Sequence, residues 1–193
     1  MKLTKEYWEN RYQQNETGWD VGEITTPLKE YFNQLTNKNI KILIPGGGNS
    51  YELEYLLSLG FSEVYVIDIV KKPLENIQKR IPTVASDLLI HGDFFEIEDS
   101  FDLIIEQTFF CALNPELREK YVQKMHALLK DNGKIIGLLF QFPLTEQGPP
   151  FGGSKSEYEN LFKDHFTIKK LETAYNSIKP RENNELFFIF EKK

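Results

Sequence analysis

Short apolar segments alternate with amphipathic segments from residue 40 onward. The apolar segments suit buried strands, whereas the amphipathic segments have the length and the period of helices. Predicted strands cover residues 40–44, 64–69, 87–90, 101–105 and 134–140, and predicted helices cover 51–59, 71–81 and about 114–129. Strands and helices that alternate in this way predict an α/β domain with a mainly parallel sheet and helices on both faces.

Several boundaries of these segments carry residues that begin helices or form turns. Ser50 precedes the helix at 51–59, and Asn114 precedes the helix that ends near residue 129. Both are residue types whose side chains cap helix N-termini. The sequence Asp-Asn-Gly at 131–133 predicts a turn before the strand that follows.

The C-terminal part departs from the alternation. A loop rich in glycine and proline at 143–153 and a helix at 155–163 precede two strands, at 166–171 and 186–190. No convincing helical segment separates these two strands. We therefore expect them to form an antiparallel pair at the end of the sheet.

The first 39 residues precede the predicted sheet. A helix is expected at 4–14 and a loop at 15–25, and Thr26 and Pro27 are expected to be the cap and the first position of a second helix. An extension of this kind has to pack against the domain, and the mouth of a ligand cleft at the strand ends is the natural place.

Composition and charge restrict the class of protein. The chain has 193 residues, of which 40% are hydrophobic, and a net charge of −6. We expect one domain over 1–193, with a helical lid or extension at 1–39 and a Rossmann-like core at 40–193. The sequence has no apolar run that could span a membrane, no signal-peptide pattern and no basic stripe for nucleic acid. One cysteine, Cys111, favours a cytoplasmic chain. We expect a monomer or weak homodimer that acts on a small molecule.

The first predicted strand ends in Pro45 and the three glycines 46–48. Ligands of open α/β sheets bind beyond the carboxyl ends of the strands, and glycine lets the backbone approach a ligand closely. The same turn is also a structural way to enter a helix. The dinucleotide pattern requires a third glycine where this chain has Tyr51, so a nicotinamide dehydrogenase is the lesser hypothesis.

Acidic residues follow the next two strands. Asp68 lies 20 residues after Gly48, where a carboxylate can accept both hydroxyls of a ribose. Asp93 can accept the exocyclic amine of an adenine, and Phe94 can contact the face of its ring. Each feature also has a purely structural interpretation. Asp68 can be a solvated aspartate at a strand end, and Asp93 with Phe94 can belong to an ordinary turn with core phenylalanines. The glycine turn, the acid and the aspartate–aromatic pair, in this order, are more specific than any one of them.

The sequence indicates no acid–base catalyst and no metal site. His91, His126 and His165 have no motif spacing. Cys111 has no indicated histidine partner, so a small buried apolar side chain is the better interpretation.

Longer stretches resemble the thiopurine S-methyltransferase family of class I S-adenosylmethionine-dependent methyltransferases. The resemblance is strongest to the branch of thiol and halide/thiocyanate methyltransferases. The matching stretches are YWENRY at 7–12, GWD at 18–20, IPGGG at 44–48, GDFF at 92–95, FDLIIEQTFFCAL at 101–113 with Pro115 and Arg118, and GPPF at 148–151. The resemblance implies a Rossmann-like fold with a mostly parallel seven-stranded sheet, and S-adenosylmethionine as cofactor.

The resemblance also implies positions for the site. The cofactor would be bound by Trp8, Tyr12, Trp19, Gly46, Gly48, Asp68, Asp93, Phe94 and Gln107, and the acceptor pocket would include Trp19, Gln107, Phe140 and Phe151. Aromatic faces attract cations such as a sulfonium by roughly 0.5–2 kcal/mol. The tryptophans can equally serve to anchor the N-terminal extension.

This chain departs from the plant members of this branch at three positions. They carry tryptophan where this chain has Tyr12, and tyrosine where it has Gln107 and Phe140. We predict methyl transfer to a small nucleophile, first a thiol or related sulfur acceptor, and next a halide or thiocyanate. A thiolate needs no general base, which agrees with the histidines that have no assigned role. The alternatives are a non-catalytic cofactor-binding protein, motivated by Glu106 and Gln107, and an NAD-dependent dehydrogenase.

Overall fold

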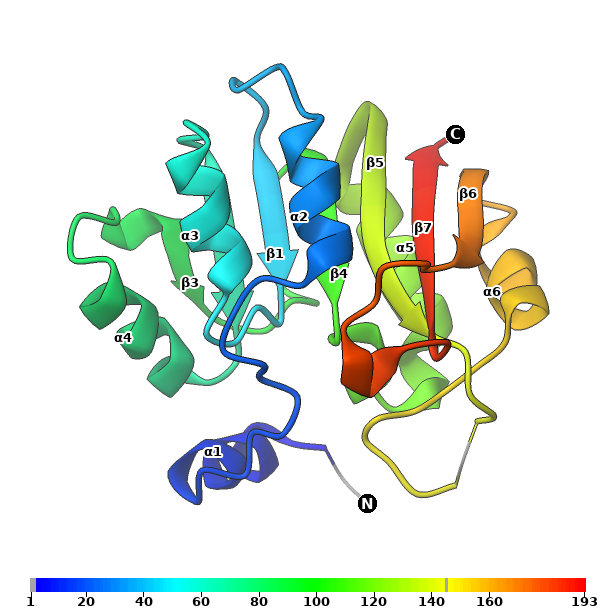
Figure 1. Cartoon of the computed structure of the whole chain (residues 1–193), viewed down its shortest axis with the longest axis horizontal. Helices are drawn as coiled ribbons and strands as arrows, with labels where there is room; N and C mark the ends of the chain where they lie inside the picture. Colours follow the sequence, from blue (N-terminus) through cyan, green and yellow to red (C-terminus); the bar gives the residue numbers. More distant parts are fainter. Residues whose placement is uncertain (1–2, 145) are drawn as a thin grey trace.

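Residues 3–144 and 146–193, which this computed structural model describes, contain one seven-stranded sheet. Its strands are β1 (Ile42–Pro45), β2 (Val64–Asp68), β3 (Leu89–His91), β4 (Phe101–Gln107), β5 (Leu129–Phe140), β6 (Phe166–Thr173) and β7 (Glu185–Lys192). They follow the order β3-β2-β1-β4-β5-β7-β6 (Figure 1). Strands β1 to β5 pair in parallel, and β7 is antiparallel to both β5 and β6. The predicted mostly parallel sheet with an antiparallel C-terminal pair is confirmed.

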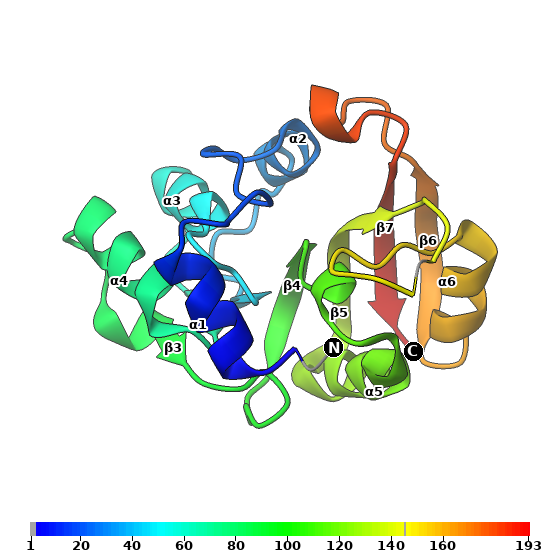
Figure 2. The same cartoon turned by 90° about the horizontal axis from the view of Figure 1, so that it is seen from below.

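Helices cover both faces of this sheet (Figures 1 and 2). One face carries α2 (Thr26–Asn33), α3 (Tyr51–Ser58) and α4 (Lys71–Arg80), and the other carries α5 (Arg118–Leu128) and α6 (Lys155–Phe162). Leu43 and Ile44 are neighbours in β1 but belong to the two opposite cores, as the alternation of a strand requires. Burial on both faces explains why β1 is apolar throughout. No helix of the described residues has both the length and the apolar character needed to cross a membrane.

Helix α1 (Lys5–Gln13) lies outside both helix layers, next to the carboxyl ends of the parallel strands (Figures 1 and 2). Thr4 caps it by accepting a hydrogen bond from the Tyr7 N–H at 3.4 Å. None of its residues is fully buried. The predicted extension therefore covers the edge of the sheet where ligands bind, although its residues 1 and 2 lie outside the described part of the chain.

Two predicted helix caps are wrong. Ser50 precedes α3, but it has φ +41°, and its side chain makes no capping hydrogen bond because the turn does not give it the extended backbone of an ordinary cap. Helix α2 begins at Thr26 itself, because the extended Thr25 before it occupies the N-cap position. Pro27 is therefore the second residue of that helix.

Three strands begin two or more residues away from the predicted position. β1 begins at Ile42 instead of residue 40. β3 begins at Leu89 because Ser86–Leu88 form a short 3-10 helix. β5 begins at Leu129, so residues 131–133, predicted as a turn, belong to this strand. They lie where the pairing of β5 with β4 shifts in register. The predicted loop at 143–153 contains no helix or strand among its described residues, and residue 145 lies outside them.

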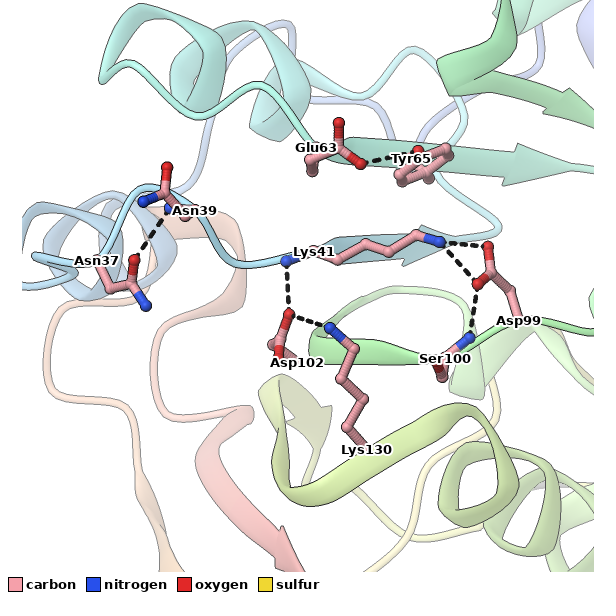
Figure 3. A network of polar contacts seen from close by, with 9 residues as sticks. All are labelled: Asn37, Asn39, Lys41, Glu63, Tyr65, Asp99, Ser100, Asp102 and Lys130. Atoms are coloured by element: carbon pink, nitrogen blue, oxygen red, sulfur yellow. Dashed lines mark hydrogen bonds and ion pairs between the residues drawn. The ribbon is translucent and has the colours of Figure 1, made fainter.

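Charged side chains join the amino ends of β1, β4 and β5, at the edge of the sheet away from α1 (Figure 3). Asp102 Oδ2 accepts hydrogen bonds from the Lys41 backbone N–H and from Lys130 Nζ, both at 2.8 Å. Lys41 Nζ pairs with Asp99 at 2.7 Å. Because these groups are partly exposed, the pairs contribute little stability, but they fix how the strands start.

Candidate functional site

A cavity of about 470 Å³ lies at the carboxyl ends of the parallel strands, between the sheet and the N-terminal segment. It spans the boundary between β1 and β4, where the strand order switches, and its volume suits small-molecule ligands. Its wall includes residues from α1 and from the ends of β1, β2, β3, β4 and β5. The cavity therefore collects segments that are far apart in the sequence.

The glycine turn after β1 borders this cavity through Gly46. Gly46 and Gly48 have φ of +55° and +54°, in the left-handed region that favours glycine. A Cβ atom on Gly46 would lie 2.1 Å from Cδ2 of Phe109, and one on Gly48 would lie 2.9 Å from the Tyr12 hydroxyl. The turn thus needs glycine both for its backbone and for the close approach of two aromatic side chains.

Asp68, the last residue of β2, is tied to this turn. Its Oδ2 accepts the Gly48 N–H at 2.9 Å, and its Oδ1 accepts the Val70 N–H at 2.8 Å. Burial raises the pKa of the Asp68 carboxyl, and these two hydrogen bonds oppose the rise. Since an ionised carboxylate offers about four acceptor positions, both oxygens keep capacity toward the cavity.

Asp93 and Phe94 follow β3 and border the same cavity. Asp93 Oδ1 accepts the Phe95 N–H at 2.8 Å, which fixes the turn. The Phe94 ring is buried and packs edge-on against Phe109, with centroids 5.2 Å apart. Phe94 therefore belongs both to the core and to the cavity wall.

Three aromatic side chains of the N-terminal segment converge on the cavity. Trp19 packs edge-to-face against Trp8 and Tyr12, with centroid distances of 5.6 and 5.8 Å. Burial, and next the Asp68 carboxylate, raise the pKa of Tyr12, which remains a neutral phenol. Arg181 Nη2 donates to the Trp19 carbonyl at 2.8 Å. These contacts attach the N-terminal segment to the core.

A smaller cavity of about 50 Å³ lies behind the glycine turn. The Thr25 hydroxyl donates to Gln107 Oε1 at 3.4 Å on its wall. Ser50 and Glu52 also border it, and the buried Ser50 Oγ has no hydrogen-bond partner among the described residues. Burial raises the pKa of Glu52 to about 7. Polar groups therefore make up a larger share of this wall than of the wall of the larger cavity.

Most of the residues predicted from the sequence come together here. The larger cavity is bordered by Trp8, Tyr12, Trp19, Gly46, Asp68, Asp93, Phe94 and Phe140. The smaller cavity is bordered by Trp19, Gly46, Gly48 and Gln107. Phe151 borders neither cavity, because its ring lies against Gly148 while its N–H donates to the Cys111 carbonyl at 2.8 Å. Pro149 and Pro150 border the larger cavity in its place.

Arg181 borders both cavities and was not singled out by sequence reasoning. It ends a short 3-10 helix before β7 and is buried. Its Nη1 lies 3.5 Å from Glu185 Oε1, and its guanidinium lies 5.9 Å from the Phe140 ring center. No motif surrounds this arginine in the sequence. It reaches the cavity because β7 pairs with β5, which brings the preceding connection alongside Phe140.

The side chains of Glu106 and Cys111 are buried and make hydrogen bonds within the protein. The Glu106 side chain is fully buried and accepts hydrogen bonds from backbone and Tyr121 instead of facing the cavity. Cys111 is buried, its thiol donates to the Thr108 carbonyl at 3.3 Å, and burial raises the pKa of the thiol. Within residues 3–144 and 146–193, no group of three or more His, Cys, Asp or Glu residues could hold a metal ion.

The fold is shared with solved methyltransferase structures. The chain is similar to 1,6-didemethyltoxoflavin-N1-methyltransferase from Burkholderia thailandensis, with a TM-score of 0.77 and 16% identity, over 99% of this chain and 88% of that one. It is also similar to a TehB-like S-adenosylmethionine-dependent methyltransferase from Corynebacterium glutamicum, with a TM-score of 0.67 and 17% identity, over 98% of each chain. These likenesses, with the strand order above, define the Rossmann-like fold of class I methyltransferases.

Sequence comparisons identify the family within this class. The family model for thiopurine S-methyltransferase matches residues 3–192, and the chain belongs to this family. A probable thiol methyltransferase 2 of Arabidopsis thaliana is 33% identical over 159 residues, which cover 80% of this chain and 70% of that protein. Thiocyanate methyltransferase 1 of Brassica oleracea is 27% identical over 186 residues, covering 92% and 81%.

The chain is therefore an S-adenosylmethionine-dependent methyltransferase. This assignment sets the dehydrogenase alternative aside. The non-catalytic alternative also loses part of its motivation, because the Glu106 side chain points into the core and accepts hydrogen bonds there.

Proposed function

We propose that this methyltransferase acts on a small sulfur nucleophile, first a thiolate, with thiocyanate and halide ions as further acceptors. The observation that carries the proposal is the wall of the larger cavity around Phe140. Trp8, Trp19 and Phe140 make this part apolar, and the buried Arg181, whose guanidinium also pairs with Glu185, borders it. An apolar wall excludes water from a nucleophile, and a guanidinium favours its anionic form.

The cofactor assignments extend this proposal to named residues. Asp68 would accept hydrogen bonds from the ribose hydroxyls, and Asp93 with Phe94 would hold the adenine. Support comes from the position of all three at the ends of β2 and β3 on one cavity wall. Gly46 and Gly48 let the Phe109 ring and the Tyr12 hydroxyl come close to the turn, and both side chains would then lie beside a ligand chain that passes it.

The smaller cavity would receive the methionine end of the cofactor. A carboxylate and an unpartnered hydroxyl, from Glu52 and Ser50, suit the α-ammonium group, since both can accept its hydrogen bonds. Gln107 and Thr25 lie on the same wall and would contact the remaining atoms of that end. With this placement, the cofactor would extend from the adenine site, past the ribose site, to the glycine turn and the smaller cavity behind it.

When bound, S-adenosylmethionine supplies a methyl group on a cationic sulfur. The protein's contribution is to align the acceptor with that carbon and to exclude water. Trp8 and Trp19 would face the cation, and Arg181 would hold the acceptor as an anion before transfer. An acceptor that is already a thiolate has no proton to lose, so no side chain is needed as a base. This agrees with the neutral thiol of Cys111 and the inward-facing Glu106.

We further propose that the N-terminal extension, residues 1–39, of this single domain contains a lid in the segment before α2, because α2 itself packs in the core with residues of 40–193. The proposal is supported by an α1 helix without fully buried residues that still contributes aromatic side chains to the cavity. A cytoplasmic monomer or weak homodimer would agree with the free, buried Cys111. It would also agree with a described surface on which only Val21, Leu144 and Tyr175 are large exposed apolar residues.

A methyl-transfer assay with matched acceptor pairs tests the acceptor class. Benzenethiol, hydrosulfide, thiocyanate and iodide would be compared with phenol and aniline, and formation of S-adenosylhomocysteine would be measured. We expect turnover with the sulfur acceptors and little with the oxygen and nitrogen analogues. Efficient methylation of phenol or aniline with no activity on any thiol would contradict the proposal.

A further inference from the structure

Glu106 ends β4 next to the cavity, yet its side chain turns into the core. The residue is fully buried. Its Oε1 accepts the backbone N–H groups of Phe109 and Phe110, each at 2.8 Å, and its Oε2 accepts the Tyr121 hydroxyl at 2.5 Å. Three donors, two of them from one short segment, thus converge on one carboxylate.

The segment that Glu106 holds has an unusual backbone. Thr108 has φ +59°, in the left-handed region that non-glycine residues rarely adopt, and the 3-10 helix Phe110–Ala112 begins immediately afterwards. The N–H groups at the start of such a helix have no partner within it, and here the Glu106 carboxylate accepts two of them. Without this acceptor, the turn at Thr108 would leave buried donors unsatisfied.

The segment that begins at Thr108, directly after the carboxyl end of β4, also shapes the cavity. The Phe109 ring lies so close to Gly46 that no Cβ would fit there, and it packs against Phe94. The Cys111 carbonyl accepts the Phe151 N–H and so holds the loop that follows β5. A shift of the segment would therefore move two parts of the cavity wall together, the part beside the glycine turn and the part formed by the loop after β5.

We propose that Glu106 is a positioning residue for the methyltransferase site, and that it acts by fixing the Thr108–Phe110 backbone so that the Phe109 ring is held against Gly46. Glu106 touches neither cavity, so its effect on the ligands is transmitted through Phe109. The inference rests on the proposed cofactor site at the glycine turn, since Phe109 can influence cofactor binding only if the cofactor lies there.

The chemistry of this site distinguishes three substitutions. In Glu106→Gln, the amide oxygen can accept both backbone N–H groups, and the amide NH₂ can donate to the Tyr121 oxygen. In Glu106→Asp the charge remains, but the side chain is one methylene shorter and cannot reach all three donors. In Glu106→Ala the acceptor is lost. A positioning role therefore predicts that Glu106→Gln keeps the cofactor affinity and the activity that Glu106→Asp and Glu106→Ala reduce.

Asp102 offers a matched control at the other end of the same strand. Its carboxylate also accepts a backbone N–H and a side-chain donor, from Lys41 and Lys130 (Figure 3). It lies at the amino edge of the sheet, away from the cavity. Asp102→Ala should therefore leave cofactor affinity unchanged.

The experiment measures the dissociation constant of S-adenosylhomocysteine by calorimetry, together with kcat and KM for both substrates, on variants shown to be folded. We expect Glu106→Asp and Glu106→Ala to weaken cofactor binding and to reduce kcat/KM by about 10- to 100-fold, the range that a displacement of about 1 Å can cause. Glu106→Gln should stay within a few fold of the parent, as should Asp102→Ala. Glu106→Asp keeps the test available if Glu106→Ala does not fold.

A double-mutant cycle shows whether the effect passes through Phe109. If it does, adding Glu106→Asp to Phe109→Ala should weaken binding little further, whereas Asp102→Ala and Phe109→Ala should combine independently. Glu106→Asp binding as tightly as the parent, or losses that simply add to that of Phe109→Ala, would overturn the inference. A parent protein that binds no S-adenosylhomocysteine would instead remove the proposed cofactor site.

Discussion

The Tyr12 hydroxyl lies directly over Gly48, so close that a Cβ on this glycine would come within 2.9 Å of the oxygen. This contact joins the N-terminal helix to the glycine turn, and Gly48 in turn donates its N–H to Asp68. The N-terminal segment, the turn and the proposed ribose acceptor are thus linked in one chain of contacts.

Gly48→Ala is expected to weaken cofactor binding and stability together. Alanine at φ +54° costs about 1–2 kcal/mol of backbone strain, and its methyl group would also displace the Tyr12 hydroxyl. Tyr12→Phe removes the hydroxyl, so the double variant should recover the steric part of the loss but not the strain. Thermal unfolding and calorimetric titration with S-adenosylhomocysteine would measure both. No recovery in the double variant would show that the contact is unimportant.

Asp68→Ala should reduce cofactor affinity by roughly 10- to 150-fold, the effect of losing about 1.5–3 kcal/mol of hydrogen bonds to a charged group. It should also lower stability, because the Gly48 and Val70 N–H groups lose their acceptor. Asp68→Asn keeps one oxygen acceptor and should be milder in both respects. Titration with NAD, which we expect not to bind the parent, serves as the ligand control. An alanine variant with parental affinity would leave Asp68 a purely structural role.

The sequence predicted the sheet and the glycine turn well because their signals are local. β1 and β2 are short, apolar and bounded by glycine or aspartate, and Asp68 and Asp93 lie at strand ends where parallel topology brings them together. The direction of Ser50 could not be predicted, because the left-handed turn, rather than the residue type, decides where its hydroxyl points.

Long-range packing decided the remaining site positions. Arg181 reaches the cavity only because β7 lies between β5 and β6, which no local pattern around the residue reveals. Phe151 belongs to a matching stretch, yet its N–H bonds the Cys111 carbonyl and its ring lies against Gly148. A motif thus located the loop correctly without specifying which of its side chains border the cavity.

Glu106 should make the parent less stable as pH rises toward neutrality. Burial raises its pKa to about 7, above the ordinary value of 4.5, so the folded chain binds this proton more tightly than the unfolded chain. The contribution of Glu106 to the free energy of unfolding is therefore complete below about pH 4.5. It is lost as pH rises through about 7, a change on the order of 3 kcal/mol. Glu106→Gln removes this dependence. Urea unfolding of both proteins at pH 5, 6, 7 and 8 would show the difference.

Asp102→Asn is the control for that measurement. Hydrogen bonds and Lys130 hold the pKa of Asp102 below its usual value despite some desolvation, so its stabilising contribution is lost only as pH falls through the acidic range. The difference in unfolding free energy between the parent and Asp102→Asn should therefore stay constant from pH 5 to 8. Parallel pH curves for the parent and Glu106→Gln would contradict the raised pKa.

Trp19→Ala is expected to lower turnover and cofactor affinity while the sheet core stays folded. Trp19 packs against Trp8 and Tyr12, and its carbonyl accepts a hydrogen bond from Arg181, so this residue connects the N-terminal segment to the core beside the cavity. Lids of this kind exclude water and complete a site on closing. If the segment served only for packing, the variant would lose stability and keep its turnover per folded molecule.

Phe61→Ala separates these two outcomes, because Phe61 is a buried aromatic residue of the core before β2 that borders neither cavity. It should destabilise the protein by about 3–5 kcal/mol and leave the activity of the folded fraction intact. Hydrogen exchange gives an independent measurement of the lid itself. Binding of S-adenosylhomocysteine should slow exchange across residues 8–20, because closure orders the segment over the ligand. Equal exchange in the free and bound states would show that these residues do not act as a lid.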